Sequence, residues 1–264
     1  MLKIQSLASG SKGNVIYISD GVTNILVDQG LGLRELGKRM EAIGLDPRTV
    51  NAVLVTHEHS DHIKGVAPFL KNYPNVVLYL PDIAVIPFLS KIGRVPDDCF
   101  QSFNEKFNIN DIEIDFFELQ HDSEFCFGYV FKNGDCKISL ATDLGIINEA
   151  IIKKMAGSQI VLIESNHDTT KLSHNAKYPS WLKRRVAGPH GHLSNVACSA
   201  AVYQLATTGV QQVILAHLSE ENNTPTLALS VVRDFLASKG IIEGQDINID
   251  VATQFNPSNL FQVE

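Results

Sequence analysis

The chain has 264 residues, and a formal net charge of −7 excludes a broadly basic nucleic-acid-binding surface. A local basic patch remains compatible with that charge. Hydrophobic residues make up 44% and charged residues 19% of the sequence, which provides material for a full core and excludes a disordered chain.

The amino terminus and the cysteines favour a cytoplasmic protein. Residues 1–7 alternate like a strand and lack the basic and apolar regions of a signal peptide. No apolar run reaches the roughly 18 residues of a membrane span, so we expect no membrane partner. The four cysteines lack a metal-binding C-x-x-C spacing, and we expect reduced, mostly buried thiols.

Strands dominate the first part of the sequence. Apolar alternation predicts strands at 3–8, 14–19 and 23–28, with the small-residue loop 9–13 after the first of them. Helical spacing predicts a helix at 33–43. The apolar run Asn51–Thr56 (NAVLVT) is typical of a strand buried on both faces. A helix is expected to begin within residues 57–62, because Ile63, Val66, Phe69 and Leu70 recur at helical spacing. A strand at 76–80 and a helix at 83–92 follow.

The second part begins with strands and continues with alternating helices and strands. Strands are expected at 112–119, 127–132 and 136–141. Helices at 148–156, 195–207 and 224–239 precede strands at 159–163, 210–216 and 247–251, respectively. This order predicts an α/β fold with two sheets and helices outside them. Because the sequence contains no linker or repeat, we interpret residues 1–264 as one domain.

The segment His57-Glu58-His59-Ser60-Asp61-His62 directly follows the apolar run and carries the strongest chemical signal. His57 and His59 are two residues apart, so in extended chain both imidazoles point the same way. Asp61 and His62 follow at a turn and can face a second point. Imidazole and carboxylate ligands suit zinc, and also manganese or iron. Four ligands in six residues exceed the needs of one ion and indicate two, whereas a solvated histidine-rich turn is the alternative interpretation.

This pattern resembles the signature of the metallo-β-lactamase superfamily, whose fold is an αββα sandwich of two mixed sheets with helices on both outer faces. Four further residues, each just after a predicted apolar strand, match the remaining motifs of that family in order. They are Asp28, His121, Asp143 and His217. Each alone could be an ordinary polar residue that ends a strand.

The resemblance implies a division of these residues between two divalent ions. One ion would be held by His57, His59, His121 and Asp143. The other would be held by Asp61, His62, Asp143 and His217. Asp28 would orient the histidine loop from behind. A hydroxide bridging the ions would be the nucleophile, and Asp61 therefore also counts among the catalytic residues.

Two residues that differ from the motifs of other branches, together with four additional motifs, indicate which branch of the superfamily this sequence resembles. His59 stands where the iron-dependent oxidoreductases carry Glu, and Asp143 stands where many true β-lactamases carry Cys. The segments 6–14, 164–168, 191–195 and 217–224 resemble the YycJ/WalJ-like family, which is associated with 5′-to-3′ exonuclease activity on double-stranded DNA. A DNA substrate is therefore expected.

Other residues are expected to serve catalysis or substrate binding. Similarity of Gly191–Ser194 to transfer-RNA 3′-end processing enzymes implies that His192 assists the leaving group, with Glu164 as its partner, although His192 could simply stabilise the start of a helix. We expect substrate contacts from the following residues, while recognising that the first four could form only a hairpin connection. They are Ser9, Ser11, Lys12, Asn14, Asn166, His167 and Asn195.

The leading hypothesis is a metal-dependent phosphodiesterase or nuclease. A small-molecule hydrolase of the same fold, acting on a thioester, a lactone or a cyclic phosphodiester, is the second hypothesis. The third is a metal-binding regulatory protein without turnover, which the complete second ligand set disfavours. Lys183-Arg184-Arg185 could contact a nucleic-acid backbone or could be a solvated helix end. Metal identity and oligomeric state stay open.

Overall fold

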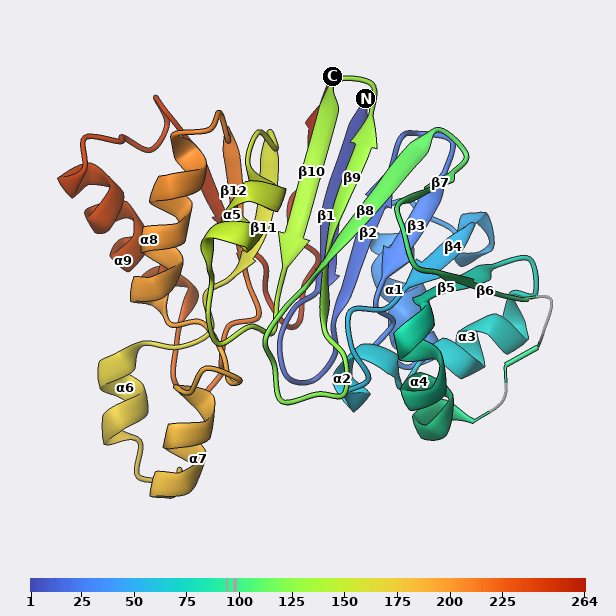
Figure 1. Ribbon diagram of the computed structural model, residues 1–264, viewed down its shortest axis with the longest axis horizontal. Helices are drawn as coiled ribbons and strands as arrows, with labels where there is room; N and C mark the ends of the chain where they lie inside the picture. The colour runs from blue at the N-terminus through green and yellow to red at the C-terminus, as the bar shows by residue number, and fades with distance from the viewer. Residues whose placement is uncertain (94, 97–98) are drawn as a thin grey trace.

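Two seven-stranded β-sheets face each other in the structure, a computed structural model that describes residues 1–93, 95, 96 and 99–264 (Figure 1). The first sheet has the order β14 (Phe261–Val263), β1 (Leu2–Ala8), β2 (Val15–Ser19), β3 (Asn24–Val27), β4 (Ala52–Leu54), β5 (Val77–Pro81) and β6 (Phe100–Phe103). The second has the order β13 (Asn248–Val251), β12 (Gln212–Ala216), β11 (Ile160–Glu164), β10 (Cys136–Ala141), β9 (Phe127–Asn133), β8 (Ile112–Glu118) and β7 (Phe107–Ile109).

Helices cover the outer side of each sheet (Figure 1). Beside the first sheet lie α1 (Leu33–Ala42), α3 (Val66–Asn72) and α4 (Val85–Ile92), and beside the second lie α5 (Glu149–Met155), α8 (Asn195–Ala206) and α9 (Pro225–Ser238). Shorter elements are α2 (Ser60–Ile63), α6 (Thr169–His174), α7 (Ser180–Val186) and the 3₁₀ turns Pro47–Thr49 and Asp82–Ala84. The predicted αββα sandwich is confirmed. Of the helices described, none is long and apolar enough to span a membrane.

Alternating side chains of the second sheet supply two separate hydrophobic cores. In β11, Ile160 and Leu162 pack into the core between the sheets, whereas Val161 and Ile163 pack toward α8 and α9. This follows from the two-residue period of a strand, and it explains why β11 is apolar throughout.

Most predicted strands and helices are confirmed to within a few residues, but five short elements are not predicted. β6, β7 and β14 have only three or four residues, and several of their side chains are exposed, so they carry no clear alternation. α6 and α7 lie in a stretch that the sequence analysis left without structure; α7 has no buried residue and therefore no apolar stripe.

Candidate metal centre

The candidate ligands lie where strands of both sheets end. β3 and β4 are parallel in the first sheet, and β10, β11 and β12 are parallel in the second, so their carboxyl ends meet at one edge of the sandwich. Asp28, Asp143 and His217, which follow three of these strands, have φ values of 62°, 62° and 54°. Non-glycine residues rarely adopt this left-handed conformation, which costs about 1–3 kcal/mol each. The fold therefore holds three candidate site residues in strained backbone.

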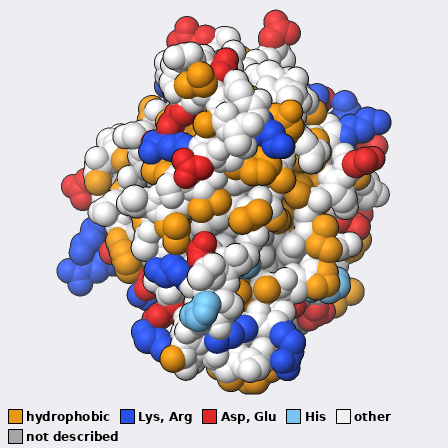
Figure 2. Space-filling view, turned by 90° about the vertical axis from the view of Figure 1, so that its left-hand side faces the viewer, with side chains coloured by type: hydrophobic (Ala, Val, Ile, Leu, Met, Phe, Trp, Pro, Cys, Tyr) orange, Lys and Arg blue, Asp and Glu red, His pale blue; other side chains and the backbone are white. Residues whose placement is uncertain are grey.

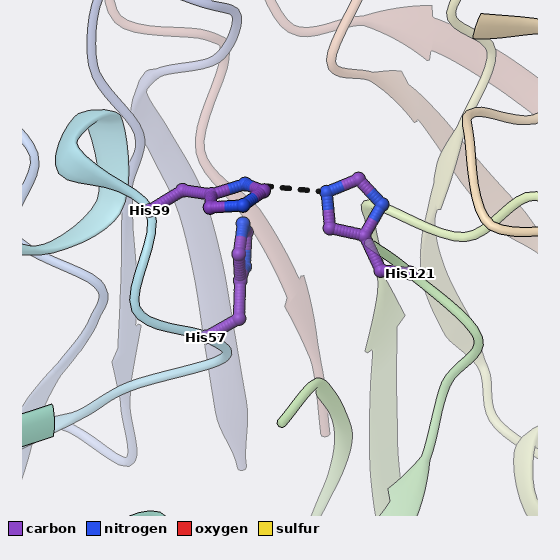
Figure 3. Close-up of side chains that lie close together, drawn as sticks. All are labelled: His57, His59 and His121. Atoms are coloured by element: carbon purple, nitrogen blue, oxygen red, sulfur yellow. Dashed lines mark hydrogen bonds between the residues drawn. The ribbon is translucent and has the colours of Figure 1, made fainter. Parts of the chain in front are cut away.

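Three histidines form the first cluster: His57, His59 and His121 (Figure 3). Figure 3 shows their rings converging from the loop after β4 and the loop after β8. Nε2 of His121 lies 3.3 Å from Nδ1 of His59. Nδ1 of His121 donates to the carbonyl oxygen of Gly191 at 3.1 Å, because a carbonyl can only accept, and this leaves its Nε2 free as a ligand.

Asp61, His62 and His217 form the second cluster. Nε2 of His62 lies 3.5 Å from Oδ2 of Asp61, and Nε2 of His217 lies 3.9 Å from the same oxygen. Nδ1 of His62 donates to Asp28 at 2.7 Å, and Nδ1 of His217 donates to Glu164 at 2.8 Å. Carboxylates thus fix both rings from behind and leave Nε2 of each ring directed at the cluster.

Asp143 lies between the two clusters. Its Oδ2 is 3.4 Å from Nε2 of His62, and its Oδ1 is 4.0 Å from Nε2 of His121. Oδ2 of Asp143 is buried and has no hydrogen-bond partner among the described residues, and the same holds for Nε2 of His57 and Nε2 of His217. Buried polar atoms normally have partners, so three such atoms facing one place indicate a missing ligand. Imidazole and carboxylate donors at these positions fit two divalent ions, with Asp143 shared.

Thr56 is a supporting residue that the sequence analysis did not identify. Its backbone N–H and its hydroxyl both donate to Asp28, each at 2.8 Å. The same hydroxyl oxygen lies 3.0 Å from Nδ1 of His57 and 3.2 Å from Nδ1 of His62. Thr56 therefore links the aspartate to one histidine of each cluster. A threonine immediately before His57 was visible in the sequence, but only the contacts reveal this role.

Burial and neighbouring charges set opposite pKa shifts within this centre. Burial, reinforced by the surrounding histidines, holds the pKa of His57 well below its usual value. Burial also acts against the charged form of His62, but Asp28 and Asp143 outweigh it and raise the pKa of His62 to about 9. For Asp61, burial is outweighed by His217 and His62, which lower the pKa of its carboxyl group. The site thus favours the ionised carboxylate of Asp61, the form that binds metal.

Glu164, at the end of β11, connects the metal centre to His192. Its Oε1 accepts from Nδ1 of His192 at 2.9 Å as well as from His217, and its Oε2 accepts the backbone N–H groups of Leu144 and Leu193. Glu164 is fully buried, and burial alone would keep it neutral, but His192 and these hydrogen bonds lower its pKa. The predicted contact between His192 and Glu164 is present; a catalytic role for the pair stays a prediction.

The loop of residues 9–14 lies beside the candidate metal centre, and its residues differ in exposure and in hydrogen-bond partners. Ser11 is exposed and lines a pocket of about 110 Å³, whereas the exposed Lys12 pairs with Glu220 at 2.7 Å. Ser9 is buried, and its hydroxyl oxygen accepts the backbone N–H of His217. Asn14 is also buried, and its amide contacts Asp61 and His62 at 3.2 and 2.9 Å. Substrate contacts from these four residues therefore stay a prediction, and Asn14 lies against two candidate ligands, Asp61 and His62.

The predicted substrate residues in the second half of the sequence also differ in their burial and hydrogen bonds. Asn166 lines the pocket and donates to the carbonyl oxygen of His217 at 2.8 Å. His167 is buried, and its Nδ1 has no hydrogen-bond partner in the part of the chain that the structure describes. Asn195 is buried, and its amide group is hydrogen-bonded to Ser165 and Asn223, so a substrate contact from Asn195 stays a prediction. The pocket next to the second cluster is lined by Ser11, Asn166, Tyr178, Val186, His192, His217, Leu218, Ser219 and Asn222.

A family model for the β-lactamase superfamily domain matches residues 23–218. Among curated proteins, the exodeoxyribonuclease YycJ of Bacillus anthracis is 34% identical over 254 residues, which cover 94% of each chain. The chain belongs to the metallo-β-lactamase superfamily. The exodeoxyribonuclease WalJ of Streptococcus pneumoniae is 31% identical over 94% of this chain and 93% of its own. The predicted YycJ/WalJ-like relationship is therefore confirmed, and the chain is a hydrolase of this superfamily.

Solved structures agree on the fold. The metallo-β-lactamase fold protein YhfI of Bacillus subtilis superimposes with a TM-score of 0.72 at 13% identity, covering 98% of this chain and all of that one. The short form of human tRNase Z superimposes with a TM-score of 0.63 at 13% identity, covering 97% and 98% of the two chains. At such identities the likeness extends to the fold alone.

Proposed function

We propose that this hydrolase is a phosphodiesterase with two metal ions that acts on DNA from an end, in the manner of an exodeoxyribonuclease. The observation that carries the proposal is the pair of ligand clusters joined by Asp143, with three buried ligand atoms unpartnered. Two relatives of at least 31% identity over nearly the whole chain carry the name exodeoxyribonuclease. A cytoplasmic location accords with this function.

In this proposal the candidate ligands bind the metal ions, and His192 transfers a proton. The first ion would be held by His57, His59, His121 and Asp143, and the second by Asp61, His62, Asp143 and His217. Bound ions would supply Lewis acidity and lower the pKa of water toward neutrality. Asp28 accepts from Nδ1 of His62, and Glu164 accepts from Nδ1 of His217 and of His192, so these carboxylates orient three imidazoles. Of these rings, that of His192 lies at the pocket and has no predicted ligand role.

His192 is suited to protonate the leaving oxygen of a phosphodiester. Although burial opposes protonation, the Glu164 carboxylate raises the pKa of His192 and so favours the protonated imidazole. An alkoxide is a poor leaving group, and a positioned acid accelerates its departure by about 10²–10⁴-fold. A thioester would gain little from such an acid because a thiolate leaves readily. This difference favours a phosphodiester over a thioester as the substrate.

The test is a substrate panel with the Zn²⁺- or Mn²⁺-loaded protein. It should contain double-stranded DNA with free ends, closed circular DNA, RNA, a cyclic phosphodiester, a thioester and a lactone. We expect mononucleotide release from linear DNA and none from closed circles. Faster turnover of the thioester or lactone than of every phosphodiester would refute the proposal.

A further inference from the structure

Basic side chains concentrate in one segment of this acidic chain. Residues 169–191 contain five Lys or Arg residues and no Asp or Glu, whereas the chain as a whole has a net charge of −7. The segment contains α6 and α7 and projects beyond both sheets at the edge where the candidate ligands lie (Figure 1). Figure 2 shows Lys and Arg side chains gathered on this lower part of the molecule. The five residues are Lys171, Lys177, Lys183, Arg184 and Arg185.

α7 also exposes the one tryptophan of the sequence. Trp181 is 59% exposed, and no residue of α7 is buried, so Trp181 does not anchor the helix in a core. Arg184 and Arg185 follow it by three and four positions, which places all three on the same side of the helix. An exposed indole beside guanidinium groups is an arrangement that stacks on unpaired bases while neutralising phosphates.

The carboxyl-terminal end of α7 is attached directly to the candidate metal centre. The carbonyl oxygen of Val186 accepts the backbone N–H of His192 at 2.8 Å, and that of Gly191 accepts from His121. Arg185 pairs with Asp122, the neighbour of His121. Val186 lines the same pocket as His192. The basic surface is therefore continuous with the place where cleavage is proposed.

Not all of the basic side chains are available to a ligand. Lys177 pairs with Glu221, Lys183 donates to the carbonyl oxygen of Ser173, and Arg185 is engaged with Asp122. Lys171 and Arg184 are exposed, and among the described residues neither side chain has a hydrogen-bond or ion-pair partner. Of these two, Arg184 shares its helix with Trp181.

We infer that Trp181 and Arg184 form a docking surface for the unpaired end of a DNA strand, with Trp181 stacking on a base and Arg184 contacting a phosphate. The inference rests on the proposed function and adds the path by which a strand approaches the metal centre. An end that is separated from its complement exposes bases, and those bases need an aromatic surface. Charge complementarity and the continuity of α7 with the pocket favour DNA as the occupant.

Trp181 provides its own signal for the test, because no other tryptophan contributes to the fluorescence. The full-length, Zn²⁺-loaded protein would be titrated with a single-stranded phosphorothioate oligonucleotide of about 12 nucleotides, a length within the usual range of single-strand sites. We expect the oligonucleotide to quench the emission, and an abasic strand of equal length to quench it much less. Equal quenching by both strands, or none by either, would overturn stacking on Trp181.

Three variants separate the two contacts, with affinity measured from the anisotropy of a labelled oligonucleotide. Trp181→Ala should weaken binding about tenfold while leaving its salt dependence unchanged. Arg184→Ala should reduce the slope of log affinity against log salt by about 0.7, the amount expected for one lost phosphate contact. Arg34→Ala removes an exposed arginine on α1 and is the charge-matched control. If Trp181→Ala and Arg184→Ala bind like Arg34→Ala, the inference is wrong.

The binding readout is independent of the hydrolysis that tests the proposed function. Binding that depends on Trp181 and Arg184 without any DNA cleavage would support the docking surface and contradict the exonuclease. If Trp181→Ala and Arg184→Ala cleave linear DNA at the wild-type rate and bind it with the wild-type affinity, the result would support the exonuclease and contradict the docking surface.

Discussion

Nδ1 of His192 donates to Oε1 of Glu164 at 2.9 Å, and Oε1 also accepts from the candidate ligand His217 at 2.8 Å. One carboxylate oxygen thus serves both a histidine proposed for proton transfer and a histidine proposed for metal binding. The buried charge of Glu164 is compensated by these two rings and by two backbone N–H groups. Changes at Glu164 are therefore expected to affect proton transfer and metal affinity together.

The first prediction concerns the pH dependence of kcat. Burial opposes the protonated form of His192, but the Glu164 carboxylate raises its pKa, so the acid form persists to higher pH than in a free histidine. Activity that needs this proton should fall as pH rises through that pKa. In Glu164→Gln the charge is lost, and the alkaline fall should move to lower pH. Steady-state rates on linear DNA across the pH range, with metal content measured at each pH, provide the test.

Glu118→Gln, at an exposed carboxylate on β8, is the control and should leave the profile unchanged. An alkaline limb in Glu164→Gln that coincides with that of the wild type would exclude His192 as the titrating acid.

The second prediction separates acid catalysis from metal binding at His192. His192→Ala should keep its metal content but lose about 10²-fold or more in kcat on DNA. The loss should shrink with a nitrophenyl phosphodiester, because nitrophenolate leaves without a proton. If His192 only positions substrate, KM should rise and the loss should be equal for both leaving groups.

The third prediction concerns metal removal. Metal analysis of the purified protein should approach two ions per chain, and chelation should abolish hydrolysis until Zn²⁺ or Mn²⁺ is restored. Asp143→Ala removes the carboxylate between the two clusters, so metal content and activity should fall together. Ser11→Ala changes an exposed residue of the pocket lining and should keep both ions. A chelated protein with verified metal loss and undiminished turnover would contradict this mechanism.

Apolar strands followed by polar residues made much of this arrangement predictable. The apolar run Asn51–Thr56 predicted a buried strand. In parallel sheets, functional side chains lie at the carboxyl-terminal ends of the strands. His57, His62 and His217 could therefore be assigned together although 160 residues separate the first from the last. The strain at Asp28, Asp143 and His217 was not predictable, since it arises from the loops that hold them.

The surroundings of the predicted substrate residues could not be read from the sequence. Sequence shows that Ser9 and Asn195 lie near functional motifs, but not whether their polar groups face solvent or the protein. In the structure both are buried and bonded within the protein, Ser9 to His217 and Asn195 to Ser165 and Asn223. Likewise, α7 is held by its attachment to the metal centre rather than by a hydrophobic face, and so left no helical pattern in the sequence.

The fourth prediction tests how the backbone aligns the ligand loops. Gly30 lies where the loops after β1, β3 and β4 meet: its N–H donates to the carbonyl oxygen of Asn14, whose own N–H donates to that of Asp61. A Cβ at Gly30 would lie 1.6 Å from the carbonyl oxygen of Asp61 and 2.8 Å from the backbone nitrogen of Asn14. These are backbone atoms, so the overlap cannot be relieved by a side-chain rotation. Gly30→Ala should therefore destabilise the metal-free protein by about 3 kcal/mol and displace Asp61.

Gly32→Ala is the matched control, because no atom lies within 4 Å of the added Cβ and the φ of −66° suits alanine. Its stability should stay within about 0.5 kcal/mol of the wild type. Urea denaturation of the metal-free variants gives both free energies of unfolding, and metal titration then shows whether the site is damaged. In Gly30→Ala the second cluster, which contains Asp61, should lose affinity more than the three-histidine cluster. Equal stability of the two variants would show that the ligand loops adjust freely, and that close backbone packing does not align Asp61 with His62 and His217.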